Sequence, residues 1–114
     1  MTQDRPTRPY DPEYVRSRVR ELAAKGWQGL ATPGLAGLCV GTLESLFDDK
    51  DRAIRAAKRH TMTTYLIGKG SSKEWTAGEA NAMLKWCADR ECAPLEAERI
   101  VLLYEATHGQ QQLL

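Results

Sequence analysis

The sequence predicts an all-α protein, folded as one compact bundle of about five helices. Apolar residues recur at intervals of three and four along several segments, which is the spacing of a helix that buries one face. Clear helix-start signals precede these segments, and no segment shows the alternation of apolar and polar residues that is typical of a strand. The apolar stripes never continue over several heptads, so we do not expect a long coiled coil.

The length of 114 residues and the hydrophobic content of 42% suit a single domain with one packed core. We expect an extended N-terminal arm over residues 1–10, a helical domain over 11–109 and a frayed C-terminal tail over 110–114. No apolar run approaches the roughly 18 residues that span a bilayer, and the first residues lack the apolar core of a secretion signal. The odd number of cysteines, three, favours reduced thiols, so a cytoplasmic protein with no membrane contact is expected.

The first two helices have strong start signals. Asp11 precedes Pro12 and can cap a helix that ends at Gly26, while Thr32 and Pro33 begin a second, more apolar helix. The second helix contains three glycines, each costing about 1 kcal/mol relative to alanine; they are Gly34, Gly37 and Gly41. Their cost predicts close packing against another helix. A nucleotide loop is the alternative, although the spacing is not that of a phosphate loop.

Three further helices are expected. Asp48, Asp49 and Asp51 crowd the start of a helix over about 50–67, where carboxylates complement the helix dipole. Thr76 and Glu79 form a capping box, which predicts a helix from Thr76 to about residue 88. The fifth helix is expected to have Pro94 in its first turn and to end before Gly109.

Charge is distributed unevenly along the chain. Residues 48–73 carry seven Lys or Arg against three Asp, a net charge of +4, whereas residues 74–114 carry three against seven, a net charge of −4. This asymmetry predicts one face that attracts a polyanion. The total of +1 leaves room for self-association into a homo-oligomer.

The basic segment provides the candidate nucleic-acid site. Its arginines recur at three and four residues on one face of the third helix, and two lysines occupy the glycine- and serine-containing loop that follows. That loop leads into a helix N-terminus, which can bind an anion, and a tryptophan beside it can stack on a base. The predicted contact residues are Arg52, Arg55, Lys58, Arg59, Lys69, Lys73 and Trp75. The alternatives are a solvated charged face and, for Trp75, an apolar flank that fixes the entry of the fourth helix.

Catalysis and metal binding find little support in the sequence. His60 and His108 fit structural or solvent-facing roles. Glu96, Glu98 and Glu105 follow a solvated helical surface, and no carboxylate pair is recognisable as an acid and a base. Cys87 and Cys92 with His108 lack the short paired spacings of a zinc site. We therefore expect a non-enzymatic protein without a cofactor.

Residues 59–86, RHTMTTYLIGKGSSKEWTAGEANAMLKW, resemble a helical segment of phage-associated recombination, single-strand-annealing and replication proteins. The shared features are a helix, a Ser-Ser-Lys-acid loop and a Thr-x-x-Glu-Ala helix, and a related arrangement occurs in a Mu-like phage regulator family. The resemblance covers about a quarter of the chain. It implies a setting of DNA transactions and brings no catalytic residue with it.

Two functions follow as hypotheses. The first is a small accessory protein that contacts nucleic-acid phosphates and acts with a larger recombination, replication or defence complex. The second is an interaction or assembly subunit of such a complex that does not bind nucleic acid by itself. The sequence leaves open whether DNA or RNA, single-stranded or duplex, is bound.

Overall fold

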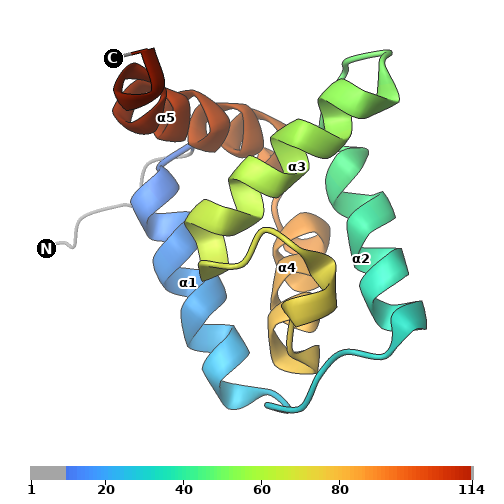
Figure 1. The fold of residues 1–114 in the computed structure, drawn as a ribbon. Coiled ribbons are helices and arrows are strands. Elements are labelled where there is room, and N and C mark those ends of the chain that lie inside the picture. Colours follow the sequence, from blue (N-terminus) through green and yellow to red (C-terminus); the bar gives the residue numbers. More distant parts are fainter. Residues whose placement is uncertain (1–9, 114) are drawn as a thin grey trace, which may run out of the picture.

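The computed structural model describes residues 10–113, with side chains up to His108. Within this range the chain forms five α-helices and no extended strand, which confirms the all-α prediction (Figure 1). The predicted N-terminal arm lies outside the described residues except for Tyr10. The helices are α1 (Pro12–Lys25), α2 (Pro33–Glu44), α3 (Arg52–Ile67), α4 (Ala77–Asp89) and α5 (Ala93–Leu113), with a short 3₁₀ helix, η1 (Ser72–Glu74), before α4.

Side-chain caps fix the starts of the first four helices. Asp11, Thr32 and Asp51 each accept a hydrogen bond from a main-chain amide in the first turn that follows. The capping box is also formed: Thr76 Oγ1 accepts from the Glu79 amide at 3.0 Å, and Glu79 Oε1 accepts from the Thr76 amide at 2.8 Å. The predicted helix starts therefore lie within one or two residues of the observed ones.

The fifth helix is longer than predicted. It continues through Gly109 to Leu113, whereas the sequence indicated an end before Gly109 and a frayed tail from residue 110. A glycine inside a helix costs only about 1 kcal/mol, which is not enough to stop propagation where no competing cap or proline follows. Glycine alone is thus a weak stop signal.

Helix α4 lies at the centre of the bundle. It packs against both α1 and α2, while α3 crosses above and contacts α1, α2 and α5 (Figure 1). The shared core is made of aliphatic side chains together with three aromatic ones, Phe47, Trp75 and Trp86, of which Trp75 is fully buried. None of the helices in the described range is long and apolar enough to cross a bilayer.

The end of α1 and the start of α4 meet at two glycines. A Cβ atom on Gly26 would lie 2.6 Å from the Gly78 Cα atom, and one on Gly78 would lie 2.6 Å from the Ala23 carbonyl oxygen. Both neighbours are backbone atoms and cannot rotate away. This contact therefore requires glycine for close approach rather than for an unusual backbone angle.

The three glycines of α2 behave differently from the prediction. Gly34, Gly37 and Gly41 are exposed, and a Cβ atom on any of them would meet nothing within 4 Å. The expectation that they pack closely against another helix of this chain is therefore wrong. Helix α2 buries the opposite side, which carries Cys39 and Leu43.

Replacing glycine by alanine should have opposite effects at these two places. Gly78→Ala forces two backbones apart and should lower the free energy of unfolding by about 2 kcal/mol, a typical cost of overpacking. Gly37→Ala adds a better helix former in open space and should raise it by about 1 kcal/mol. Urea denaturation followed by circular dichroism measures both; equal effects of the two substitutions would contradict the packing described.

Candidate functional site

The Arg59 side chain contacts other residues of the fold and is not exposed for binding a ligand. Its Nη1 atom donates to the Gly70 carbonyl oxygen at 2.9 Å, and its Nε atom lies 3.4 Å from Glu44 Oε2. Both side chains of this ion pair are only 14% exposed, and the guanidinium lies 5.9 Å from the centre of the Trp75 ring. Arg59 thus joins α3 to the end of α2 and to the 68–72 loop.

Lys58 and Arg55 are also engaged by neighbouring groups. Lys58 Nζ lies 2.8 Å from Asp49 Oδ2 and 3.3 Å from Glu98 Oε2, linking α3 to the preceding loop and to α5. The hydrogen bond with Asp49 raises the pKa of Lys58 and lowers the pKa of Asp49. Arg55 Nη1 donates to the main-chain oxygens of Asp49 and Lys50 at 2.6 and 2.9 Å.

The loop before α4 is similarly occupied. Lys69 Nζ pairs with Glu79 Oε1 at 2.9 Å, so the capping carboxylate also holds the loop lysine. Trp75 Nε1 donates to the Lys69 carbonyl oxygen at 3.0 Å, and its indole is 0% exposed. Of the two interpretations of Trp75, base stacking does not fit a fully buried ring, whereas a flank that fixes the entry of α4 does.

The N-terminus of α4 does not offer free amides to an anion. The amides of Ala77 and Gly78 donate to the carbonyl oxygens of Gly29 and Trp27 at 2.9 and 2.8 Å, and the Glu79 amide donates to Thr76. These are the donors that a helix leaves unpaired within itself. The prediction of an anion site at this position is therefore wrong.

Two members of the predicted site remain accessible. Arg52 and Lys73 are exposed, and neither side chain has an ion pair or hydrogen bond with another described residue. They come from different parts of the fold, since Arg52 begins α3 and Lys73 lies in η1 beyond its far end. The structure thus separates the seven predicted residues into a majority that stabilises the fold and two free cations.

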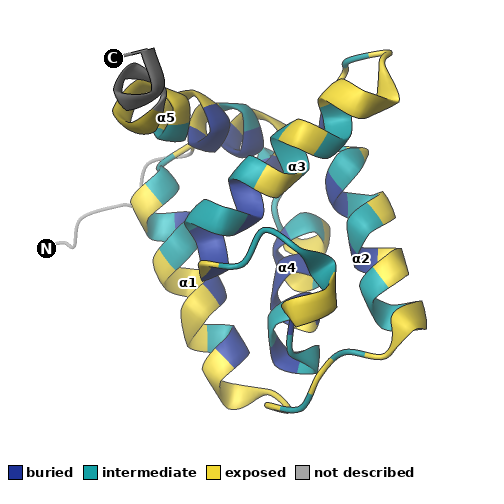
Figure 2. Cartoon of the chain, viewed as in Figure 1, coloured by how far each residue is buried: buried dark blue, intermediate teal, exposed yellow. Residues whose placement is uncertain are grey.

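Three highly exposed apolar residues near the start of the bundle had no role in the sequence-based site. Trp27, Leu30 and Leu38 are 73%, 67% and 62% exposed, on the α1–α2 loop and on α2, where Figure 2 shows much exposed surface. One feature of the sequence could have identified these residues: they lie in a segment without charged side chains. No Lys, Arg, Asp or Glu occurs between Lys25 and Glu44, although 27% of the chain is charged.

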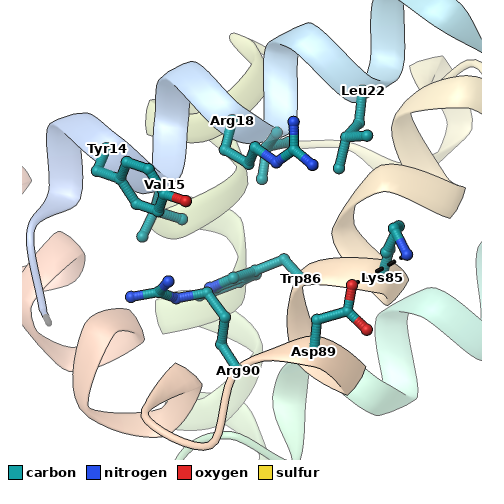
Figure 3. A pocket seen from close by; sticks show the side chains of 9 residues that line it. Tyr14, Val15, Arg18, Leu22, Lys85, Trp86, Asp89 and Arg90 are labelled. Atoms are coloured by element: carbon teal, nitrogen blue, oxygen red, sulfur yellow. Dashed lines mark ion pairs between the residues drawn. The ribbon is translucent and has the colours of Figure 1, made fainter. Parts of the chain in front are cut away.

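A hollow of about 230 Å³ lies between α1 and α4 (Figure 3). Trp86 and Tyr14 provide aromatic walls, and Arg18 and Lys85 lie at its edge. The lysine pairs with Asp89 at 3.0 Å, and Arg18 pairs with Glu21 at 3.0 Å. Arg90, which also lines the hollow, pairs with Glu96 of α5. With its three cations paired to carboxylates, the hollow brings together no nucleophile and base.

Glu96 is a fully buried carboxylate, so the expectation that it lies on a solvated helical surface is wrong. Trp86 Nε1 donates to it at 2.7 Å and Arg90 Nε at 2.8 Å, and the Cys92 thiol lies 3.4 Å away. Burial alone would raise its pKa, but the hydrogen bonds from Arg90 and Trp86 outweigh burial and lower the pKa overall. Glu96 therefore stays ionised and holds the turn between α4 and α5, rather than acting as a general acid.

The cysteines do not form a reactive or metal-binding group. Burial raises the pKa values of Cys39 and Cys87 to about 12, so both remain protonated thiols near neutral pH. Among the described residues, no three His, Cys, Asp or Glu side chains are placed to hold a metal ion.

Comparison of the chain with protein-family models, curated proteins and solved structures finds no match. The resemblance of residues 59–86 to phage recombination proteins thus stays a prediction. Functional inference rests on the residues and their geometry.

Removing the Glu96 charge should destabilise the fold and change its response to acid. Glu96→Gln leaves Arg90 without its buried partner and should cost about 3 kcal/mol. Because the folded-state pKa is lowered, the wild-type contribution is present above the unfolded pKa and is lost as pH falls through the folded value. Urea denaturation between pH 7 and pH 3 should therefore show a shallower acid decline in Glu96→Gln.

Glu98→Gln is the matched control, since this carboxylate is 38% exposed and should contribute less than about 1 kcal/mol. Equal losses in the two variants would show that the buried network is not the source of stability.

Proposed function

We propose that this chain is a non-enzymatic interaction subunit that binds an apolar helix of a larger protein partner. The contact surface, here named the docking face, lies on the α1–α2 loop and the outer side of α2. One observation carries the proposal: this exposed surface has no charge and displays large apolar side chains, as interface cores do. The docking face consists of Trp27, Leu30, Gly34, Gly37, Leu38 and Gly41.

The apolar side chains of the docking face are held in place before binding. The Trp27 indole lies directly against Gly29, where an added Cβ atom would come within 2.4 Å of the Trp27 Nε1 atom. Leu30 is flanked by main-chain hydrogen bonds, from the Ala31 amide to the Trp75 oxygen and from the Ala77 amide to the Gly29 oxygen, both 2.9 Å. A fixed tryptophan loses little conformational entropy on binding, which suits an interface anchor.

The α2 glycines favour a helix as the occupant. Without side chains at Gly34, Gly37 and Gly41, a partner helix can approach the α2 backbone closely, with Leu38 beside the contact. Each glycine costs about 1 kcal/mol of helix stability where alanine would fit, and the described residues provide no compensating contact. A close contact with another chain accounts for that cost.

The cellular setting remains the one that the sequence indicated. A partner within a recombination, replication or defence complex agrees with the resemblance of residues 59–86 to phage recombination proteins. In this arrangement the subunit contributes a rigid surface, and a larger protein supplies any catalytic chemistry.

Substitutions on the docking face should weaken partner binding without unfolding the domain. The probe is each protein encoded beside this gene, purified and tested by co-elution and isothermal titration. Trp27→Ala should reduce affinity by at least about tenfold, as expected for an aromatic anchor. Gly37→Ala should stabilise the free domain yet weaken the complex, a combination that a purely structural role does not produce.

Leu95→Ala is the control, because Leu95 is 55% exposed on α5 and lies outside the docking face. A complex that tolerates Trp27→Ala, or that loses as much affinity through Leu95→Ala, would rule out the docking face.

Phosphate-backbone binding is the second candidate function, favoured by the free, exposed side chains of Arg52 and Lys73. Fluorescence anisotropy with single-stranded DNA, duplex DNA and RNA at several salt concentrations tests it. Replacing both residues by alanine should weaken binding to all sequences alike and reduce the salt slope by about 2.

Lys85→Ala is the control, because this lysine pairs with Asp89 on another surface. If the wild-type chain does not bind nucleic acid, or binds it independently of salt, phosphate-backbone binding is ruled out and binding of a protein partner remains.

A further inference from the structure

We propose that a hollow between α1, α3 and α5 binds a phosphate group. The hollow has a volume of about 290 Å³ and lies apart from the docking face. Arg16 and Arg20 line it from successive turns of α1, Tyr65 lines it from α3, and His108 lines it from α5. Glu13 is the one carboxylate among its lining residues, so the two guanidinium groups leave the site with a positive charge.

The two arginines have more donors than the protein uses. Arg16 donates from Nη2 to Glu13 at 2.6 Å, an exposed ion pair within one helix. Arg20 donates from Nε to the Leu66 oxygen at 2.7 Å and from Nη2 to the Tyr65 oxygen at 3.3 Å. Each guanidinium carries five N–H donors, so most of them have no acceptor among the described residues. Arginine forks of this kind suit a ligand with several charged oxygens.

Arg20 is also held at a fixed position by these bonds. The carbonyl oxygens of Tyr65 and Leu66 belong to the last turn of α3, where a cation offsets the negative end of the helix dipole. The guanidinium therefore joins α1 to α3 at the edge of the hollow.

The Tyr65 hydroxyl is a further feature that supports an anion site in this hollow. Its oxygen is buried and makes no hydrogen bond of ordinary geometry with the described residues, although the carboxylates of Glu13 and Asp11 lie close enough to contribute to its raised pKa. A phosphate that reaches this hydroxyl must therefore take the place of Glu13. The Arg16 guanidinium lies over the Tyr65 ring, 4.6 Å from its centre. Burial raises the pKa of Tyr65, so the hydroxyl keeps its proton and can donate it to an anion. Movement of the half-buried Arg16 side chain away from Glu13 would open this donor to a ligand.

His108 completes the edge of the hollow. Its ring stacks on Tyr104 with centres 3.9 Å apart, and its Nδ1 atom lies 3.0 Å from the Tyr104 oxygen. These contacts orient the imidazole and leave Nε2 without a partner among the described side chains. Guanidinium, phenol and imidazole groups from three helices thus meet at one place, which favours the tetrahedral oxygens of phosphate over a single carboxylate.

The test is a titration of the full chain followed by ¹H–¹⁵N NMR, with chloride keeping the ionic strength constant. Inorganic phosphate and adenosine 5′-monophosphate are the two probes, because a phosphate group can come from the free ion or from a nucleotide. We expect saturable shifts of amides around Arg16, Tyr65 and His108. Tighter binding of the nucleotide would identify the attached group as part of the ligand, and equal binding would identify phosphate alone.

Two variants and one control test the assignment. Arg16→Gln should weaken phosphate binding about tenfold, because a charge-assisted pair is lost. Tyr65→Phe should weaken it about fivefold and, by removing an unpaired buried hydroxyl, raise the melting temperature of the phosphate-free protein. Arg18→Gln, on the side of α1 that faces α4, should change binding less than about twofold.

The proposal is overturned if wild-type shifts do not saturate at millimolar phosphate. It is equally overturned if Arg16→Gln and Arg18→Gln weaken binding to the same extent, since that pattern indicates diffuse surface charge. Should Tyr65→Phe fold normally but keep full affinity, the hydroxyl is not part of a phosphate site.

Discussion

Three main-chain hydrogen bonds between the α1–α2 loop and the start of α4 position most of this fold. The Ala77 and Gly78 amides donate to that loop, and the Ala31 amide donates back to Trp75. The bonds satisfy first-turn amides of α4 that have no partner within the helix. They also bring the end of α1 so close to α4 that only glycine fits at positions 26 and 78. The placement of α1, α2 and α4 follows from this one contact.

The same contact anchors the backbone of the most exposed tryptophan. Trp27 supplies one of the accepting carbonyl oxygens, so its backbone is fixed, and its indole rests on Gly29. An exposed aromatic ring on a fixed backbone is prepared for association, because little freedom remains to be lost. The proposed docking face therefore depends on an internal feature of the fold as much as on surface composition.

Most cations of the basic segment are engaged in contacts within the fold. Lys58, Arg59 and Lys69 each pair with a carboxylate from another element, and their partners are Asp49 and Glu98, Glu44, and Glu79. Residues 48–73 carry a net charge of +4, and their cations form ion pairs that join α3 and its loops to the rest of the bundle. Outside this segment, Arg16 and Arg20 on α1 line a hollow between α1, α3 and α5.

The helices could be predicted from the amino-acid sequence, because their signals are local. Asp11, Thr32, Asp51 and Thr76 cap amides two or three residues away, so a short window predicts each start. Which side chains are free depends on how the helices pack. Arg59 meets Glu44 fifteen residues away, Trp75 is buried by distant helices, and the α2 glycines face open space. Helix caps depend on neighbours in sequence, whereas burial and ion pairing depend on neighbours in space.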